Sequence, residues 1–249
     1  MFLLKLRLVR YLLTVIRLIY FTKKNRTKII KKNSKHSKKG TIDRNIKSAL
    51  SLRDCYSGER SSFFLEKYLC LYQVANQKVL LVGPRNEGEI FNFLSKGFKS
   101  KNVDAIDLFS YSPKIQIKDM HKINEIRKKY DLIYFGFILN YSKKINLVLK
   151  KSLKILNQNG MIGISLETDN WDYVTDKTKK LFKKKLKINK FEALERINKN
   201  YIYKNIIFEK LKKIFLYSYI ENLGLNFQKK KCITILLKRN VNKINKFKK

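Results

Sequence analysis

The sequence is poor in the residues that build metal centres and disulfide frameworks. Its 249 residues include only three cysteines and two histidines, and the cysteines, Cys55, Cys70 and Cys232, lie far apart. An odd and scattered set of thiols has neither the spacing of a Cys/His metal site nor that of a disulfide framework. We therefore expect no metal site, and unpaired thiols in a reducing cytoplasm.

Acidic residues are also scarce. Lys and Arg number 57 against 19 Asp and Glu, which gives a formal net charge of +38. Such an excess is typical of proteins that bind nucleic acid or an anionic membrane. The lysines are dispersed along the chain, however, and a basic composition on solvated faces explains them equally well. No aromatic residue interleaves with the basic run 23–48, so nucleic acid is the less favoured partner.

No stretch of the chain is apolar for the roughly 20 residues that a membrane-spanning helix needs. Residues 1–22 are the nearest candidate, but polar residues form one helical stripe through them, consisting of Arg7, Arg10, Thr14 and Arg17. No small-residue cleavage site follows, so we expect no secretory signal. We expect an interfacial helix with its arginines towards lipid phosphates, so that residues 1–39 contact an anionic membrane. The protein would then be cytoplasmic and peripheral at the inner membrane face. The alternative is a helix packed on the protein's own core or on a partner.

Composition divides the chain into two expected parts. Residues 1–48 comprise the basic amphipathic helix and a run rich in Lys and Asn, which is typical of a solvated linker. Residues 49–249 alternate short apolar runs with helical patterns, as α/β domains do. Within this domain we expect the core at 78–168. The substrate and closing region would be 169–249, with a Lys-rich helical stretch and then strands at 215–220 and 232–237.

The core begins with a continuous apolar run at 78–82, typical of a strand buried on both faces. Turn-forming residues follow from Gly83. After them Ile90, Phe93 and Leu94 recur at helical spacing, and Gly97 is placed to end that helix. This order predicts a strand, a tight loop and a helix, the first unit of a nucleotide-binding sheet.

A second expected strand, 103–108, carries Asp107 near its end, 24 residues after Gly83. In Rossmann-like units an acidic residue roughly 20 residues beyond the glycine loop binds the ribose hydroxyls. A carboxylate suits this task because it accepts two hydrogen bonds from a diol. Asp107 is therefore a candidate ribose ligand.

These elements, with those that follow them, resemble the core of class I S-adenosylmethionine-dependent methyltransferases of the methyltransferase type 11-like kind. The similar segments are 79–83 (first strand and loop), 105–108 (ribose acid), 117–121 (adenine loop), 130–142 (fourth strand and its loop) and 153–165 (fifth strand and the turn before it). The resemblance implies a Rossmann-like α/β fold with a mostly parallel seven-stranded sheet and helices on both faces. It also implies S-adenosylmethionine as cofactor.

The first loop departs from the family's Gly-x-Gly-x-Gly pattern. Arg85 and Glu87 replace the second and third glycines, and Gly88 comes one place later. Asn86 tolerates a left-handed backbone better than most residues, so Gly83, Asn86 and Gly88 still suffice for a tight loop. A degenerate α/β domain that binds no cofactor is the alternative.

The resemblance assigns residues to the cofactor. They are Gly83, Asn86, Gly88, Asp107, Asp119, Met120 and Phe135. The Asp119 carboxylate would accept a hydrogen bond from the adenine amine, and the Met120 sulfur would pack on the ring. Taken alone, Asp119 would be a helix N-cap.

The acceptor side has weaker signals. Tyr141 would position or deprotonate an acceptor hydroxyl, and His121 is a candidate general base with a structural role as its alternative. Asn140, Glu167 and Trp171 would contact the substrate. The loop after the fourth strand lacks the Asp/Asn-Pro-Pro-Tyr sequence of base-amine methyltransferases, and no Pro-Cys nucleophile is present, which argues against DNA methylation.

The favoured function is methyl transfer from S-adenosylmethionine to a small-molecule or glycan-type acceptor. An RNA methyltransferase is supported by charge alone. A non-catalytic binding or scaffold protein that retains the fold is the alternative from another class.

Overall fold

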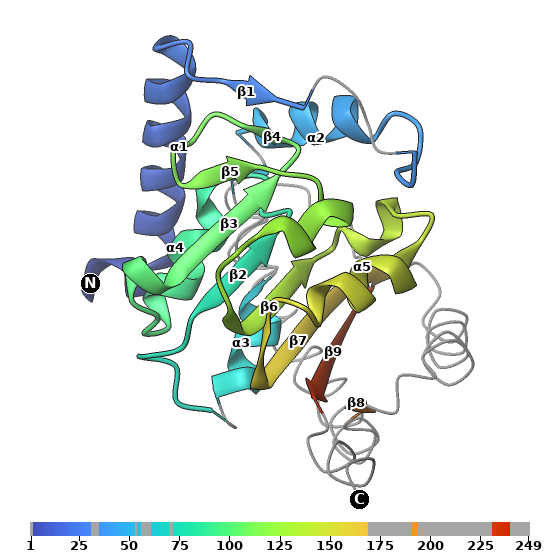
Figure 1. Ribbon diagram of the computed structural model, residues 1–249. Coiled ribbons are helices and arrows are strands. Elements are labelled where there is room, and N and C mark those ends of the chain that lie inside the picture. Colours follow the sequence, from blue (N-terminus) through green and yellow to red (C-terminus); the bar gives the residue numbers. More distant parts are fainter. Residues whose placement is uncertain are drawn as a thin grey trace, which may run out of the picture.

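The computed structural model describes residues 2–30, 35–52, 54–55, 61–69, 72–168, 191–193 and 231–239. Across these residues the main sheet has seven strands in the order β5-β3-β2-β6-β7-β9-β8 (Figure 1). They are β2 (Val79–Val82), β3 (Val103–Asp107), β5 (Ile115–Ile117), β6 (Tyr130–Gly136), β7 (Leu156–Thr168), β8 (Phe191–Ala193) and β9 (Lys231–Arg239).

Five of these strands run parallel, and β9 lies antiparallel to β7 and to β8. The mostly parallel, Rossmann-like α/β fold predicted from the sequence is confirmed. β9 contains the strand expected at 232–237, whereas the one expected at 215–220 lies outside the described residues. β7 starts at Leu156, so the expected turn before the fifth strand belongs to the strand, where its pairing with β6 shifts register.

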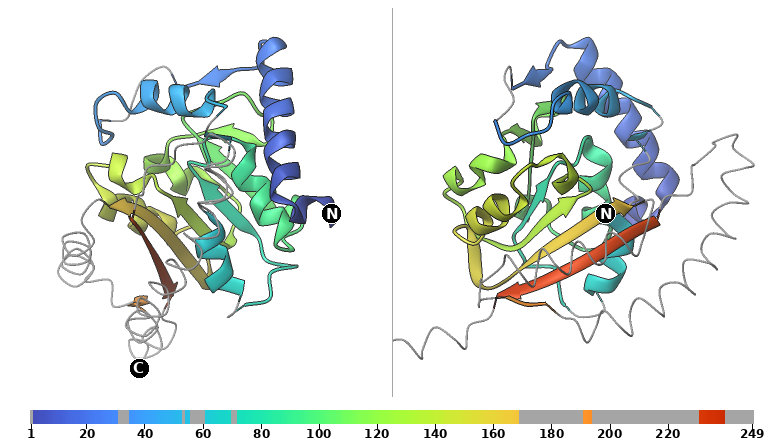
Figure 2. Two further views of the ribbon diagram at one scale, coloured as in Figure 1. Left: turned by 180° about the vertical axis from the view of Figure 1, so that it is seen from behind. Right: turned by 90° about the vertical axis from the view of Figure 1, so that its right-hand side faces the viewer.

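Helices cover both faces of the sheet (Figures 1 and 2). The α-helices are α1 (Arg7–Lys23), α2 (Thr41–Ala49), α3 (Ser62–Leu69), α4 (Glu87–Ser95) and α5 (Ile145–Ser152). Short 3-10 helices are η1 (Phe2–Lys5), η3 (Ser100–Asn102), η4 (Met120–Glu125) and η5 (Leu139–Tyr141). Gly97, at φ +102°, follows the end of α4 as predicted.

Alternate residues of the buried strands supply two hydrophobic cores. In β2, Val79 and Leu81 pack with the aromatic side chains of α3 and α4, while Leu80 and Val82 pack with η4 and α5. All four are buried, which explains why the strand reads as a continuous apolar run. The two cores hold the strand ends rigidly in place.

The segment after α1 is built into the domain. β1 (Lys28–Ile29) pairs antiparallel with β4 (Phe109–Ser110), just beyond β3. Ser37 forms a bridge with Ser142, and α2 follows it beside β4, over the strand ends (Figure 1). Most of the expected linker is thus an ordered strap, which we define as residues 28–30 and 35–49, across the carboxyl ends of the parallel strands.

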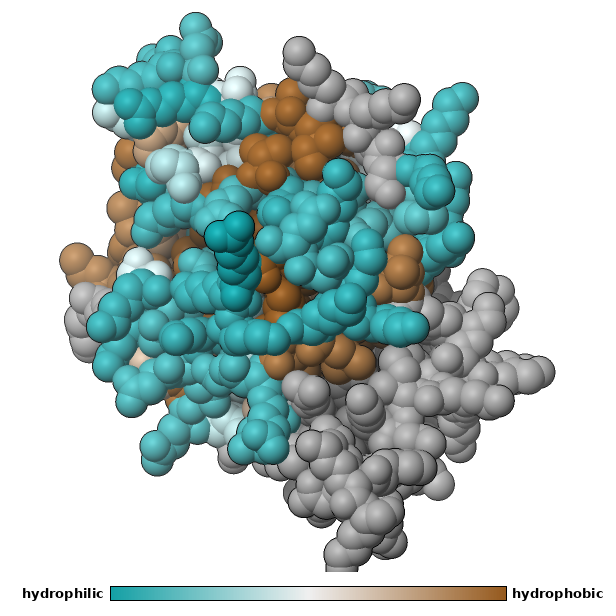
Figure 3. Space-filling model, viewed as in Figure 1, coloured by the Kyte–Doolittle hydropathy of each residue, from teal (hydrophilic) through white to brown (hydrophobic). Residues whose placement is uncertain are grey.

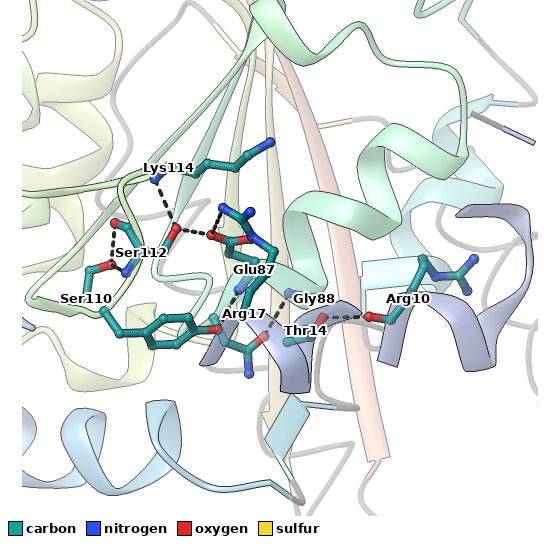
Figure 4. Close-up of polar contacts among 10 residues, drawn as sticks. Arg10, Thr14, Arg17, Glu87, Gly88, Ser110, Ser112 and Lys114 are labelled. Atoms are coloured by element: carbon teal, nitrogen blue, oxygen red, sulfur yellow. Dashed lines mark hydrogen bonds and ion pairs between the residues drawn. The ribbon is translucent and has the colours of Figure 1, made fainter. Parts of the chain in front are cut away.

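The structure corrects the predicted orientation of α1. Arg17 points towards the protein rather than towards an outer surface (Figure 4), and Arg10 is not exposed either. Arg10 is buried and donates hydrogen bonds to the carbonyl oxygens of Leu4 (2.6 Å) and Lys5 (3.0 Å). Thr14, on the same stripe, is also buried. Arg17 faces inward because α4 offers it a charged partner.

That partner is Glu87, a fully buried carboxylate in the first turn of α4. Arg17 forms a bidentate ion pair with it, one of the two contacts measuring 2.9 Å from Nη2 to Oε1. The Ser112 hydroxyl donates a further hydrogen bond to the same carboxylate. The Glu87 amide donates to the Tyr111 hydroxyl at 3.3 Å. A buried charge is tolerated only when it is paired and hydrogen-bonded in this way.

Replacing Arg17 by Ala should lower the free energy of unfolding by about 3 kcal/mol, because the buried Glu87 carboxylate then has no cation. Chemical denaturation measures the change. The control is Lys128→Ala, which breaks the more exposed Lys128–Asp104 pair and should cost less than about 1 kcal/mol. Equal costs for the two variants would contradict the role given to Arg17.

Candidate functional site

A cleft of about 560 Å³ opens at the carboxyl ends of β2, β3 and β5, beneath α2. In open α/β sheets ligands bind at this edge, because the loops after the strands diverge there. The lining residues are Ser37, Thr41, Arg44, Asn45, Ser48, Val82, Gly83, Arg85, Ile106, Asp107, Leu108, Lys118, Asp119, Met120, Ile138 and Tyr141. Four candidate cofactor residues are thereby brought together: Gly83, Asp107, Asp119 and Met120.

Gly83 makes the turn out of β2 at φ +77°, and its amide donates to the Ile106 carbonyl at 2.9 Å. A Cβ atom here would lie 2.1 Å from Cγ2 of Ile138. Both the positive φ and the close approach require glycine. The loop can therefore lie flat against Ile138, in the loop after β6.

The rest of the loop differs from expectation. The second left-handed residue is Arg85, at φ +57°, and Asn86 is extended at φ −147°. The Asn86 side chain caps α4 by accepting from the Gly88 amide (2.9 Å), and its Nδ2 donates to the Asp54 carbonyl (2.8 Å). Gly88 packs on the carbonyl oxygen of Cys55. Asn86 and Gly88 thus support the loop from behind and do not line the cleft.

Phe135, another expected cofactor residue, is fully buried in the core on the η4 and α5 side of the sheet. It belongs to β6 and pairs in register with Val82 and Ile164. Its place is below the floor of the cleft rather than in its lining.

Asp107 ends β3 with its carboxylate buried in the cleft wall. One oxygen accepts from the Leu108 amide (2.6 Å) and from Nδ2 of Asn45 (2.7 Å), and the other accepts from the Arg85 amide (3.0 Å). Burial is the largest influence and raises the pKa of Asp107 to about 6, while these three hydrogen bonds and Arg85 act to lower it. The carboxylate already binds donors from three directions.

Asn45 and its neighbours on α2 are site residues that the sequence reasoning missed. Thr41, Asn45 and Ser48 lie at helical spacing and form the face of α2 that lines the cleft. The available signal was the recurrence of small polar residues on one helical face within a lysine-rich run. The high charge of this run favoured a solvated linker over a helix that lines a site.

Asp119 belongs to a buried chain of hydrogen bonds. Its Oδ1 accepts from the His121 amide and lies 2.7 Å from the His121 ring Nδ1. Nε2 of His121 lies 2.9 Å from the Ser142 hydroxyl, and the His121 ring is buried. Asp119 thus both caps η4, as the simpler interpretation predicted, and lines the cleft. His121 links the loop after β5 to the loop after β6 and so holds the two loops in a fixed relation.

The candidate acceptor residues are placed unevenly. Tyr141 ends η5 and lines the cleft, with the Arg44 guanidinium 5.4 Å from its ring centroid. Asn140 precedes it in the same short helix. Glu167 lies near the end of β7, where it pairs with Cys232 of β9. Trp171 is outside the described residues.

The cleft carries both signs of charge. Arg44, Arg85 and Lys118 line it together with the two aspartates, so an anionic group meets cations beside the carboxylates. Within the described ranges no group of three His, Cys, Asp or Glu residues could hold a metal ion. The described helices include none with the length and apolarity needed to cross a membrane.

No protein-family model matches the sequence, and no curated protein matches it. Solved structures do. Coclaurine N-methyltransferase, bound to N-methylheliamine and SAH, is 14% identical with a TM-score of 0.44, over 90% of this chain and 88% of that chain. A ribosomal-protein methylase from Lactobacillus delbrueckii subsp. bulgaricus is 14% identical with a TM-score of 0.40, over 73% and 77% of the two chains.

A third structure, an S-adenosylmethionine-dependent methyltransferase from Clostridium acetobutylicum, is 20% identical with a TM-score of 0.32. It matches over 50% of this chain and 52% of its own. These similarities assign no residue role and no methyl acceptor to this chain.

Gly83→Ala should destabilise the protein more than Gly40→Ala does. Both glycines have φ near +75°, so each alanine carries a left-handed penalty of about 1–2 kcal/mol. Only the alanine at position 83 meets a neighbour, Ile138, whereas nothing lies within 4 Å of a Cβ at Gly40. Overpacking should add about 1–3 kcal/mol at Gly83 in chemical denaturation. Equal losses would show that the contact with Ile138 imposes no constraint.

Proposed function

We propose that this protein is an S-adenosylmethionine-dependent methyltransferase whose acceptor is a small molecule or a glycan. The observation that carries the proposal is the juxtaposition of the Gly83 turn and the buried Asp107 carboxylate at one edge of the parallel sheet. Rossmann-like sheets bind nucleosides in this way: the backbone of the glycine turn approaches the ligand closely, and a nearby carboxylate accepts hydrogen bonds from the ribose hydroxyls.

The residues present fit the cofactor. Asp107 holds an amide donor from Asn45 at 2.7 Å, so its position and orientation suit a hydroxyl donor as well. Asp119 and Met120 would hold the adenine, and Arg44, Arg85 or Lys118 would meet the carboxylate of the methionine part. Because Gly83 has no side chain, the cofactor could approach the backbone closely there.

When bound, S-adenosylmethionine supplies an activated methyl group, and its transfer depends mainly on the alignment of the acceptor. The chain's own contribution would be orientation. Tyr141 faces the cleft, and its ring lies beside the Arg44 guanidinium, so both could position a hydroxylated acceptor. The Ser142–His121–Asp119 chain would keep the loop that carries Tyr141 in a fixed place relative to the adenine side.

Two alternatives make different predictions. An RNA methyltransferase, favoured by the net charge of +38, would bind RNA with an affinity that falls steeply with salt. A scaffold protein would bind no cofactor. Glycan or small-molecule transfer is preferred because the recognisable polar groups lie together in one cleft.

Asp107→Ala should weaken S-adenosylmethionine binding by about ten- to a hundredfold, which corresponds to roughly 1–3 kcal/mol for lost charge-assisted hydrogen bonds. Isothermal titration calorimetry on the full chain measures this. The control is Asp104→Ala, which removes a carboxylate on β3 that contacts Lys128 and Tyr130 instead of the cleft. If the wild type binds no cofactor, the scaffold alternative is correct. If both variants bind equally, the cofactor does not meet Asp107.

Cofactor affinity should also fall as the pH drops below about 6. The pKa of Asp107 is raised to about 6 by burial, so the carboxylate is charged above that pH and protonated below it. Only the charged form accepts hydrogen bonds through both oxygens. The dissociation constant should therefore rise up to about tenfold per pH unit below the pKa. In Asp107→Asn, which cannot titrate, calorimetry between pH 5 and 7 should show a smaller dependence.

A further inference from the structure

The outward surface of α1 is apolar along its whole length. Between residues 6 and 22, the exposed residues are Leu6, Leu8, Leu12, Ile16, Ile19 and Tyr20. Side chains that a folded protein usually buries are about half exposed here: 54% for Leu8, 47% for Leu12 and 59% for Ile16. We call Leu8, Leu12, Ile16, Ile19 and Tyr20 the outer face. Brown surface along the left edge of Figure 3 coincides with the position of α1 in Figure 1.

This arrangement inverts that of an ordinary surface helix, whose polar side faces water. Leu8, Leu12 and Ile16 follow at intervals of four, so they occupy consecutive turns of a helix about 25 Å long. Single exposed apolar residues are common, but contiguous ones mark an interaction surface. The outer face is therefore a candidate interaction surface.

The helix cannot bury this face by rotating. Arg17 is held by the buried Glu87 carboxylate (Figure 4). Arg10 is held by the carbonyl oxygens of Leu4 and Lys5, just before the helix. Leu18 and Phe21 pack with Tyr111 on the inner side. Turning the outer face inward would break the ion pair and leave Glu87 buried without a cation, which is costly.

The charges around the outer face indicate the kind of partner. Exposed basic residues stand at both ends of α1: Lys5 before it, and Lys23, Lys24, Arg26 and Lys28 at and beyond its end. The first acidic residue of the sequence is Asp43. An apolar strip with cations at both ends matches the boundary between acyl chains and anionic headgroups. A second copy of the chain would bring like charges together, since each carries +38.

We infer that the outer face of α1 docks this protein on an anionic membrane surface. The helix lies flat, with Leu8, Leu12, Ile16 and Ile19 entering the headgroup and acyl boundary. The terminal lysines contact lipid phosphates. Arg17 has a different task, which is to fasten the helix to α4. The inference is independent of the reaction carried out in the cleft.

The test is co-sedimentation of the full chain with vesicles of equal parts phosphatidylcholine and phosphatidylglycerol, and with vesicles of phosphatidylcholine alone. The wild type should bind the anionic vesicles, with an affinity that falls as salt rises. Leu12→Glu/Ile16→Glu should weaken that binding by at least about tenfold, because two apolar contacts are lost and two like charges face the lipid.

A matched control is Gln158→Glu/Asn159→Glu, which adds the same charge at two exposed positions on β7 and should bind as the wild type does. Leu12→Ser/Ile16→Ser separates lost apolarity from added charge and should also bind more weakly. Circular dichroism and cofactor calorimetry on each variant establish that the fold is intact. Asp107→Ala should leave vesicle binding unchanged, so failure of the methyltransferase proposal is seen separately.

Three outcomes would overturn the inference. The wild type does not sediment with anionic vesicles. The variants of α1 bind as well as the wild type, in which case dispersed lysines alone make the contact. Or analytical ultracentrifugation shows a dimer that Leu12→Glu/Ile16→Glu dissociates, while no variant binds vesicles, in which case a second copy covers the outer face.

Discussion

The cleft depends on the buried carboxylate of Asp107, which joins three separate parts of the chain. It accepts hydrogen bonds from the loop after β2, from the backbone directly after β3, and from Asn45 on α2. Burying this group in its charged form is unfavourable, as its raised pKa shows, and the hydrogen bonds offset part of that cost. The bond from Arg85 orients the glycine turn, and the bond from Asn45 fixes α2 over the strand ends. The wall of the site is therefore built around the group proposed to bind the ligand.

Features determined by local pattern were predictable from the sequence. The continuous apolar run of β2 requires burial on both faces, and Gly97 ends α4 because few other residues adopt its backbone conformation. Asp107 could be found because the strand, loop, helix and strand before it have nearly fixed lengths. The positions of Asn86 and Gly88 could not, because the loop has Arg85, not Asn86, in the left-handed conformation. The Asn86 side chain is instead bonded to Asp54, which is distant in sequence.

The orientation of α1 was unpredictable for a more general reason. An amphipathic pattern shows that a helix has two different faces, but not which of them the protein covers. Here Glu87, about 70 residues away, sets the orientation, because its buried carboxylate pairs with Arg17. The same limit applies to the strap, whose small polar residues gain their meaning only from the strand ends beneath them. In both α1 and the strap, contacts with residues far away in the sequence determine which side faces the protein.

The strap also has a consequence for biosynthesis. Its attachments join Lys28 to Ser110 and Ser37 to Ser142, so their partners are made roughly 80 to 105 residues later. A nascent chain leaves the ribosome with its amino terminus first, and contacts of such high sequence separation form late. During translation the outer and inner sides of α1 are both uncovered, and the cleft has no roof until the loop after β6 has emerged. Completion of the site is thus tied to the appearance of a segment near the middle of the chain.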